Sequence, residues 1–284
     1  MVATATLDLD GLAYRYVDEG EGPPVVMVHG NPSWSYMYRK LVLALRDRYR
    51  TLAPDHIGMG RSDAPPRSEY PYDLARRVAD LARLLDAVVP DEPVTLVVHD
   101  WGGMIGLAWA VEHPEQVARL VLLNTVAFPL PADKTLPLVL QLARAPYLGE
   151  LLIRGLNAFA IGATLAGVRR RPMSRAARQG YLAPYGSWGR RVAINQFVQD
   201  IPTAPGHRSY AVVAATGERL DRLAATPTLI CWGTKDPVFD LDYLAEWERR
   251  LPGAEVHRVN GGHFGLEDAP DVVIPLIEGF LART

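Results

Sequence analysis

Residues 96–103 of this 284-residue chain read Leu-Val-Val-His-Asp-Trp-Gly-Gly. An apolar run typical of a buried strand ends at Asp100, and Gly102 and Gly103 then allow the backbone to turn sharply. The pattern predicts a helix of mostly small and apolar residues over 104–110. A strand, a tight turn and a helix in this order lift one side chain, here that of Asp100, above the edge of a sheet.

This turn resembles the nucleophile elbow of the α/β-hydrolases. Most members of that fold carry Ser or Cys at the position of Asp100 and attack a carbonyl group. A carboxylate at this position can instead displace a leaving group from saturated carbon and form an alkyl ester. The resemblance therefore implies an enzyme with an aspartate nucleophile, and it disfavours an ordinary esterase.

The resemblance also implies an order along the chain, in which the nucleophile is followed by an acid and then by a histidine. Residues 228–232 are predicted to form a buried strand, and the loop after it contains Asp236, the candidate orienting carboxylate. Asp240 is its rival, four residues later. A last strand is predicted over 254–259, and the glycine-rich loop after it ends in His263, the candidate general base.

A fourth element of the expected site lies upstream, where a predicted buried strand runs into Gly30-Asn31-Pro32. In the α/β-hydrolase fold, this loop and the residue after the nucleophile each supply one backbone N–H of the oxyanion hole. The two positions are Asn31 and Trp101, whose side chains are N–H donors as well. We expect the pair to bind a halide or another anionic leaving group.

Taken together, these motifs resemble the haloalkane dehalogenases, and they follow that family's order. The shared stretches are His29-Gly-Asn-Pro-Ser-Trp-Ser-Tyr36, Asp55-His-Ile-Gly-Met-Gly-Arg-Ser-Asp63, Asp100-Trp-Gly-Gly103, Asp236 and Gly262-His-Phe264. The strand after the elbow helix ends in Asn124 and Thr125 without a carboxylate, which favours Asp236, as in the branches that place the acid late. The resemblance implies an alkyl ester on Asp100 that is hydrolysed by water activated by His263.

A second resemblance comes from the middle of the chain. Residues 123–128, 181–188 and 197–202 are similar to the β-lactone decarboxylases of long-chain olefin biosynthesis, which belong to the dehalogenase branch with an Asp-His-Asp triad and an Asn/Trp pair. This resemblance implies that the aspartate opens a β-lactone and that carbon dioxide and a cis-olefin leave. Dehalogenation is our first expectation, and β-lactone decarboxylation is the alternative.

Two further alternatives are weaker. An epoxide hydrolase shares the aspartate elbow and would use tyrosines as acids, for which Tyr147, Tyr181 and Tyr185 are available. The Asn31 and Trp101 pair nevertheless favours an anionic leaving group. A binding protein without catalysis would tolerate a broken triad, whereas every element of the triad is present here.

The order of predicted elements indicates an α/β fold, a mostly parallel eight-stranded sheet flanked by helices. The alternation of strands and helices stops near residue 126, and the chain up to about 216 is helical and interrupted by prolines. We predict a core of residues 1–125 and 217–284 and an inserted helical cap of residues 126–216. Within the cap, residues 155–168 carry no charge but fall short of the about 20 residues of a membrane span. Three interpretations of residues 155–168 stay open: the wall of an apolar pocket, a buried helix, or a surface that contacts a membrane or a partner enzyme.

Composition narrows the classes of partner. The formal net charge of −2 excludes a basic field that would recruit nucleic acid. The single cysteine, Cys231, excludes an internal disulfide and lies in a predicted buried strand. The histidines lack ligand spacing, so we expect neither a metal nor another cofactor. We expect an apolar small-molecule substrate, no transmembrane segment and, without a signal-peptide pattern, a cytoplasmic location. A pathway enzyme or a second copy of the chain stays possible as a partner.

Overall fold

The computed structural model describes residues 3–130 and 134–284, and these residues form an eight-stranded sheet. The strands are β1 (Thr4–Leu9), β2 (Leu12–Glu19), β3 (Pro24–Val28), β4 (Arg50–Pro54), β5 (Val94–Asp100), β6 (Val117–Thr125), β7 (Thr228–Gly233) and β8 (Glu255–Val259). Their order is β1-β2-β4-β3-β5-β6-β7-β8; β2 pairs antiparallel with both β1 and β4, and all the other neighbouring pairs are parallel. The predicted sheet is confirmed.

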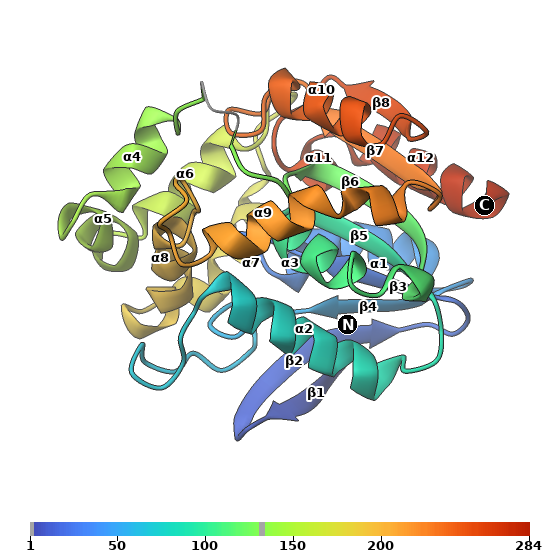
Figure 1. The fold of residues 1–284 in the computed structure, drawn as a ribbon. Helices are drawn as coiled ribbons and strands as arrows, with labels where there is room; N and C mark the ends of the chain where they lie inside the picture. The colour runs from blue at the N-terminus through green and yellow to red at the C-terminus, as the bar shows by residue number, and fades with distance from the viewer. Residues whose placement is uncertain (1–2, 131–133) are drawn as a thin grey trace.

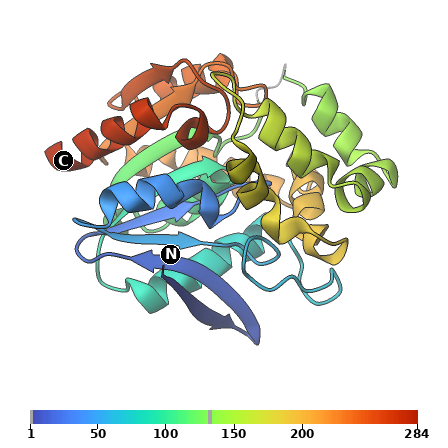
Figure 2. The same ribbon diagram turned by 180° about the vertical axis from the view of Figure 1, so that it is seen from behind.

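Helices cover both faces of this sheet. One face carries α2 (Leu74–Val88), α3 (Trp101–Ala110), α9 (Tyr210–Glu218) and α10 (Leu241–Arg250), whereas α1 (Arg39–Leu45) and α12 (Pro270–Arg283) cover the other (Figures 1 and 2). Short helical turns complete the core: η1 (Ser35–Tyr38), η2 (Pro114–Gln116), η6 (Leu220–Leu223) and α11 (Gly265–Asp268). Helix α2 illustrates the local cause, because Asp73 caps its N-terminus and its leucines recur at helical spacing on the buried side.

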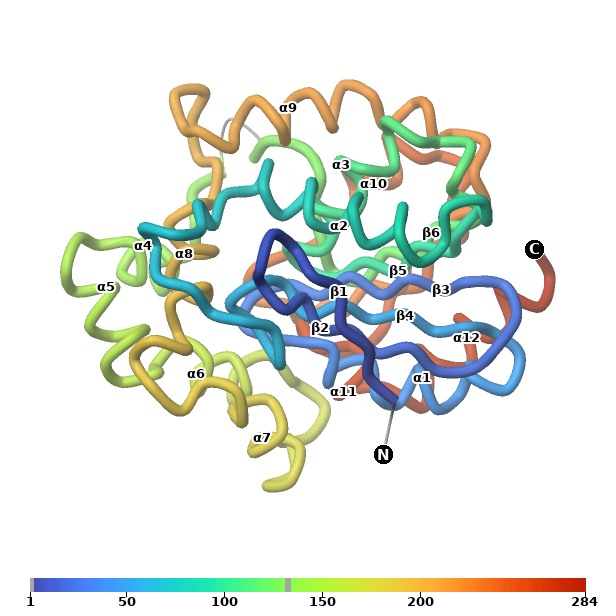
Figure 3. Tube along the Cα trace, turned by 90° about the horizontal axis from the view of Figure 1, so that it is seen from below, coloured from blue at the N-terminus to red at the C-terminus, as the bar shows by residue number. Residues whose placement is uncertain are grey.

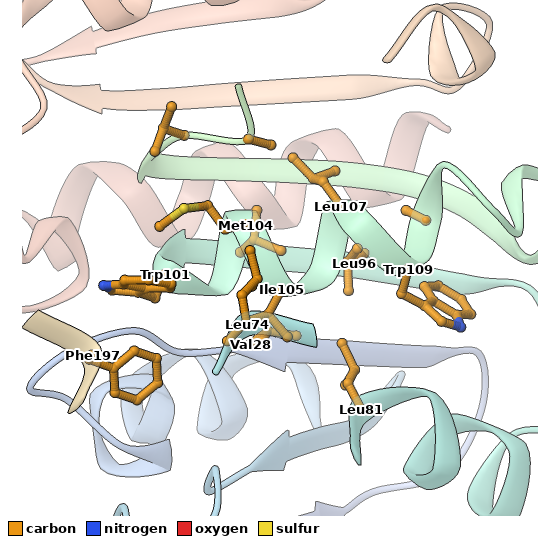
Figure 4. Close-up of a cluster of buried hydrophobic side chains, with 14 of the residues drawn as sticks. Val28, Leu74, Leu81, Leu96, Trp101, Met104, Ile105, Leu107, Trp109 and Phe197 are labelled. Carbon is orange, nitrogen blue, oxygen red and sulfur yellow. The ribbon is translucent and has the colours of Figure 1, made fainter. Parts of the chain in front are cut away.

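Helix α3 is buried along its whole length, and its side chains pack with those of β3, β5 and α2 (Figure 4). It begins at Trp101, three residues before the predicted start, so both glycines lie in its first turn. A Cβ atom on Gly102 would lie 1.9 Å from the carbonyl oxygen of Val28, and one on Gly103 would lie 1.9 Å from Thr125 Oγ1. The glycines therefore permit close contact between the helix and the sheet, beyond allowing a turn.

The chain between β6 and β7 is helical. Its elements are α4 (Leu138–Arg144), α5 (Leu148–Glu150), the π-helical turn η3 (Leu151–Gly155), α6 (Ala158–Ala166), α7 (Arg175–Leu182), η4 (Ala183–Tyr185), η5 (Gly189–Arg191), α8 (Val192–Gln199) and α9. Helices α4 to α8 gather beyond the carboxyl ends of the parallel strands, whereas α9 lies along α3 (Figures 1 and 3). The cap boundaries at 126 and 216 stay a prediction, and residues 131–133 of that segment lie outside the described residues.

Within the described ranges, no single helix has the length and apolar character needed to cross a membrane. Two helical segments, Leu148–Gly155 and Ala158–Ala166, have the required length and apolar character only when they are taken together, and the chain bends by 73° between them. The predicted cytoplasmic location stays a prediction.

A buried ion pair joins α2 to the inserted helices. Arg77 on α2 and Asp200 just after α8 are both almost fully buried, and Arg77 Nη1 lies 3.3 Å from Asp200 Oδ2. The other oxygen of Asp200 accepts hydrogen bonds from Ser209 Oγ at 2.8 Å and from Arg208 Nε at 2.7 Å. The guanidinium of Arg77 lies 3.7 Å above the ring of Phe197. Because buried charges are costly unless paired, this contact holds α2 and α8 in one arrangement.

We expect Asp200→Asn to lower the free energy of unfolding by about 3 to 5 kcal/mol, since it leaves the Arg77 cation buried without a counter-charge. Urea denaturation at neutral pH measures the change. Arg83→Gln is the matched control, because Arg83 forms its ion pair with Asp10 at the surface. Such exposed pairs contribute little to the free energy of unfolding. Equal losses in the two variants would contradict this assignment.

Candidate active site

Asp100 sits in a strained backbone conformation between β5 and α3. Its φ is 54° and its ψ is −125°, a region that side chains other than glycine rarely adopt and that costs about 1 to 3 kcal/mol. The hydroxyl of Thr125 donates a hydrogen bond to the carbonyl oxygen of Asp100. A Cβ atom on Gly30 would lie 2.0 Å from Asp100 Oδ1, so the loop after β3 can approach the carboxylate because it carries glycine.

The carboxylate of Asp100 is buried and is bound by backbone N–H groups. Asp100 Oδ1 accepts a hydrogen bond from the backbone N–H of Asn31 at 2.6 Å, and the backbone N–H of Trp101 also bonds to the carboxylate. Burial raises the pKa of Asp100 to about 6, although His263 and the two N–H groups favour the ionised form. At neutral pH the group is therefore an ionised carboxylate with little contact with water, which suits a nucleophile.

His263 lies between two carboxylates. Its Nδ1 is 2.8 Å from Asp236 Oδ2, and its Nε2 is 3.8 Å from Asp100 Oδ2. Asp236 Oδ1 accepts a hydrogen bond from the backbone N–H of Val238 at 2.8 Å, which fixes the carboxylate. Burial disfavours the imidazolium, but Asp236 and then Asp100 outweigh it and raise the pKa of His263 above its ordinary value. The structure thus brings together the three residues that the sequence singled out.

The rival acid, Asp240, has a different place. Its side chain is half exposed, accepts a hydrogen bond from the backbone N–H of Asp242 at the start of α10, and pairs with Lys134. The end of β6 supports the loop of Asp236 instead. Asn124 Nδ2 donates to the carbonyl oxygen of Gly233 at 3.1 Å, and the backbone N–H of Gly233 donates to Asn124 Oδ1 at 2.7 Å.

His99 lies beneath the elbow, and its Nε2 is 2.9 Å from the backbone carbonyl oxygen of His263. Burial lowers the pKa of His99 well below its ordinary value, so the ring is neutral. A neutral ring that faces a carbonyl oxygen must donate its N–H to it, which fixes the tautomer. His99 therefore holds the backbone of His263 in place.

The side chains of Asn31 and Trp101 are both held by α8. Asn31 Nδ2 donates to the carbonyl oxygen of Ile194 at 3.2 Å, which leaves the second N–H of the amide for a ligand. The indole of Trp101 packs edge to face on Phe197 at 5.1 Å between ring centroids (Figure 4). Sequence reasoning missed the supporting roles of Phe197 and Arg77, because they come from α8 and α2 and meet Trp101 only in the fold.

These polar groups face one end of a cavity of about 200 Å³. The side chains of Asn31, Asp100, Trp101 and His263 share the cavity with a mostly apolar wall, of which Met104, Phe128, Leu140, Phe159, Ile201 and Phe239 are part. A cavity with few polar groups converging on one point suits an apolar molecule with a single reactive polar group.

The three tyrosines that the sequence offered as acids for an epoxide hydrolase lie outside the cavity wall. Tyr147 is 91% exposed, and the hydroxyl of Tyr185 donates to the carbonyl oxygen of Ser33 at 3.2 Å. Neither these two nor Tyr181 belongs to the cavity wall formed by the described residues. Among residues 3–130 and 134–284, no three side chains of His, Cys, Asp or Glu gather in a way that could hold a metal ion.

We expect Asp100→Asn to stabilise the protein at pH 7. The pKa of Asp100 is about 6 in the folded chain against 3.8 for the free side chain, so the folded state binds the proton more tightly. Stability contributed by this group is present at low pH and is lost as the pH rises through 6. The variant should therefore gain about 1 to 3 kcal/mol at pH 7, and the gain should vanish near pH 4.

Urea denaturation at the two pH values measures this difference. Asp236→Asn is the matched control and should destabilise the protein, because the Asp236 carboxylate is bonded to His263 and to Val238. An Asp100→Asn variant that is no more stable than the parent at pH 7 would refute the buried, ionised carboxylate.

The chain is similar to a family of known proteins and to individual members of it. Residues 23–270 match the family described as the alpha/beta hydrolase fold. A cis-3-alkyl-4-alkyloxetan-2-one decarboxylase of Shewanella oneidensis is 50% identical over 279 residues, which cover 98% of this chain and 88% of that protein. One from Xanthomonas campestris pv. campestris is 47% identical, covering 96% of this chain and 93% of that protein.

Haloalkane dehalogenases are similar at lower identity. One from Mycobacterium marinum is 35% identical, covering 94% of this chain and 88% of that protein. The crystal structure of a haloalkane dehalogenase from Agrobacterium tumefaciens superposes with a TM-score of 0.88 at 25% identity, covering 99% of this chain and 97% of that chain. Both resemblances drawn from the sequence are thus confirmed, as is the predicted fold class.

Proposed function

This chain belongs to the α/β-hydrolase fold family, and on that premise we propose that it is a decarboxylase that converts cis-3,4-dialkyl β-lactones into cis-olefins and carbon dioxide. The proposal rests on the buried carboxylate of Asp100, which faces an apolar cavity beside the donors Asn31 and Trp101. It is supported by the decarboxylase relatives at 50% and 47% identity, against 35% for the dehalogenase. The sequence motifs put dehalogenation first and β-lactone decarboxylation second. The identities of the relatives favour the opposite order, so dehalogenation becomes the second candidate.

The first step opens the lactone ring. The oxygen of Asp100 that faces His263 attacks the ring carbon that bears the lactone oxygen, and the bond between that carbon and the oxygen breaks. The ring oxygen leaves as part of a carboxylate that stays attached to the neighbouring carbon. The side-chain N–H groups of Asn31 and Trp101 stabilise this developing negative charge, while the second oxygen of Asp100 keeps its hydrogen bond to the backbone N–H of Asn31.

The second step releases both products. The bond between the new carboxylate and its carbon breaks, its electron pair forms the double bond, and the ester oxygen of Asp100 leaves to restore the carboxylate. No proton or water is consumed. Attack with inversion followed by anti elimination leaves both alkyl groups on the same side, so a cis lactone gives a cis olefin. His263, whose pKa is raised by Asp236, lies beside the Asp100 oxygen that leaves in this step.

Dehalogenation would use the same first step with halide as the leaving group. Here His263, oriented by Asp236, would take a proton from water, and the water would attack the carbonyl carbon of the ester. The backbone N–H groups of Asn31 and Trp101 would then stabilise the oxyanion on Asp100. The two reactions therefore differ in the fate of the Asp100 oxygens, because only hydrolysis introduces an oxygen from water.

We expect turnover of a cis-3,4-dialkyl β-lactone in ¹⁸O-water to yield cis-olefin and to leave Asp100 unlabelled. Gas chromatography identifies the olefin, and mass spectrometry of the peptide containing Asp100 reports the label. A 1-bromoalkane is tested in parallel. Halide release with ¹⁸O in Asp100, and no olefin from the lactone, would establish dehalogenation instead. Asp100→Ala should lower olefin formation at least about 10³-fold, and an unchanged rate in this variant would contradict both reactions.

We expect Trp101→Phe to lower kcat for the β-lactone about 10²-fold to 10³-fold with little change in KM. The substitution keeps an aromatic ring against Phe197 and removes only the indole N–H, which acts as negative charge develops. Trp109→Phe, on the same helix but outside the cavity wall, is the matched control. Equal kcat values for the two variants would remove Trp101 from the proposed mechanism.

A further inference from the structure

The outer face of the inserted helices exposes a concentration of apolar side chains. Thirteen large apolar side chains are exposed in the part of the chain that the structure describes, and ten of them lie between residues 138 and 188. We call the exposed apolar side chains of α4, α5, η3, α6 and the turn between η3 and α6 the outer helical face, represented by Leu138, Leu142, Leu148, Leu151, Leu156 and Leu165. Apolar patches of this kind on a protein surface mark sites of contact with another molecule.

This face is continuous with the cavity that contains Asp100. Val139 on α4 is 62% exposed and also belongs to the cavity wall. Helix α6 contributes Phe159 and Ala163 to the cavity, whereas Ile161 and Leu165 of the same helix are exposed. Helices α4 and α6 therefore contribute apolar side chains both to the outer helical face and to the cavity wall.

The same segment carries a strong positive charge. Residues 126–216 contain eleven Lys and Arg against three Asp and Glu, although the whole chain has a formal net charge of −2. Arg169, Arg171 and Arg175 are exposed between the end of α6 and the start of α7, and Arg171 Nη2 lies 4.0 Å from Asp271 Oδ1. Arg190 and Arg191 donate hydrogen bonds to backbone carbonyl oxygens, and neither forms a salt bridge with a carboxylate among the residues that the structure describes.

We propose that the outer helical face docks on the surface of an anionic lipid bilayer. Its leucines would enter the boundary between headgroups and acyl chains, and the surrounding arginines would pair with lipid phosphates. Tyr147 and Trp188, both exposed, are the aromatic types that favour this depth. A second copy of the chain fits poorly, since a symmetric contact would bring two strongly positive surfaces together. If the proposed reaction holds, docking also places Val139, an exposed residue of the cavity wall, next to lipophilic substrate dissolved in the bilayer.

Co-sedimentation of the whole protein with vesicles tests this docking. We expect binding to vesicles of phosphatidylcholine mixed with phosphatidylglycerol, weaker binding to phosphatidylcholine alone, and a loss of binding as salt is added. The double variant Leu156→Gln with Leu165→Gln should bind the mixed vesicles about tenfold less tightly. The control double variant Leu43→Gln with Leu241→Gln removes two leucines of similar exposure that lie on α1 and α10, outside the outer helical face. It should leave vesicle binding intact. Arg175→Gln should weaken binding about fivefold, and Arg67→Gln should not.

Failure of the parent protein to sediment with the mixed vesicles overturns the proposal, as do equal losses in the two double variants. A dimer seen by light scattering, lost in the Leu156→Gln and Leu165→Gln variant and unaccompanied by vesicle binding, would assign the face to a second copy. Turnover of a detergent-dispersed β-lactone is measured on the same samples. Neither Leu156 nor Leu165 belongs to the cavity wall, so the Leu156→Gln and Leu165→Gln variant should still turn over the dispersed lactone. Loss of vesicle binding with turnover kept is a change in docking alone, whereas a parent protein without turnover would contradict the proposed reaction.

Discussion

The burial of one carboxylate at the end of the central strand is the constraint on which the rest of this structure depends. Asp100 occupies a strained conformation at the start of α3, away from water, and backbone N–H groups of Asn31 and Trp101 bind it. The loop after β3 must approach this carboxylate closely, and it can do so because residue 30 is glycine. The fold gives up stability at this position and obtains a carboxylate that is reactive because it is poorly solvated.

Positive charge is placed around this carboxylate in two ways. His263 is held between Asp236 and Asp100, and these two carboxylates favour its charged form beside the oxygen atoms of Asp100. Further away, the buried cation of Arg77 lies over Phe197, which in turn supports the indole of Trp101. The first arrangement acts directly at the reacting atoms. The second acts through packing, because it fixes the position of a hydrogen-bond donor.

The inserted helices have two distinct surfaces. Toward the core, α6 presents Phe159, Gly162 and Ala163 to the cavity, where small side chains leave room for an apolar guest. Toward the outside, exposed leucines lie between residues 138 and 165 and arginines follow at 169–175, on a segment that is far more basic than the rest of the chain. Because the two proposed reactions would use the same triad, we expect this inner wall to select the substrate.

The sequence by itself determined the eight strands, the elbow at Asp100 and the order of Asp236 and His263, because alternation, glycine turns and chain order are local patterns. Tertiary structure decided the rest. Asp236 and Asp240 follow the same strand, and only the path of the loop shows that Asp236 meets His263 while Asp240 caps α10. Helix α3 starts at Trp101 because its glycines pack on the sheet. Contacts between distant segments depend on how they pack, and no local pattern encodes that.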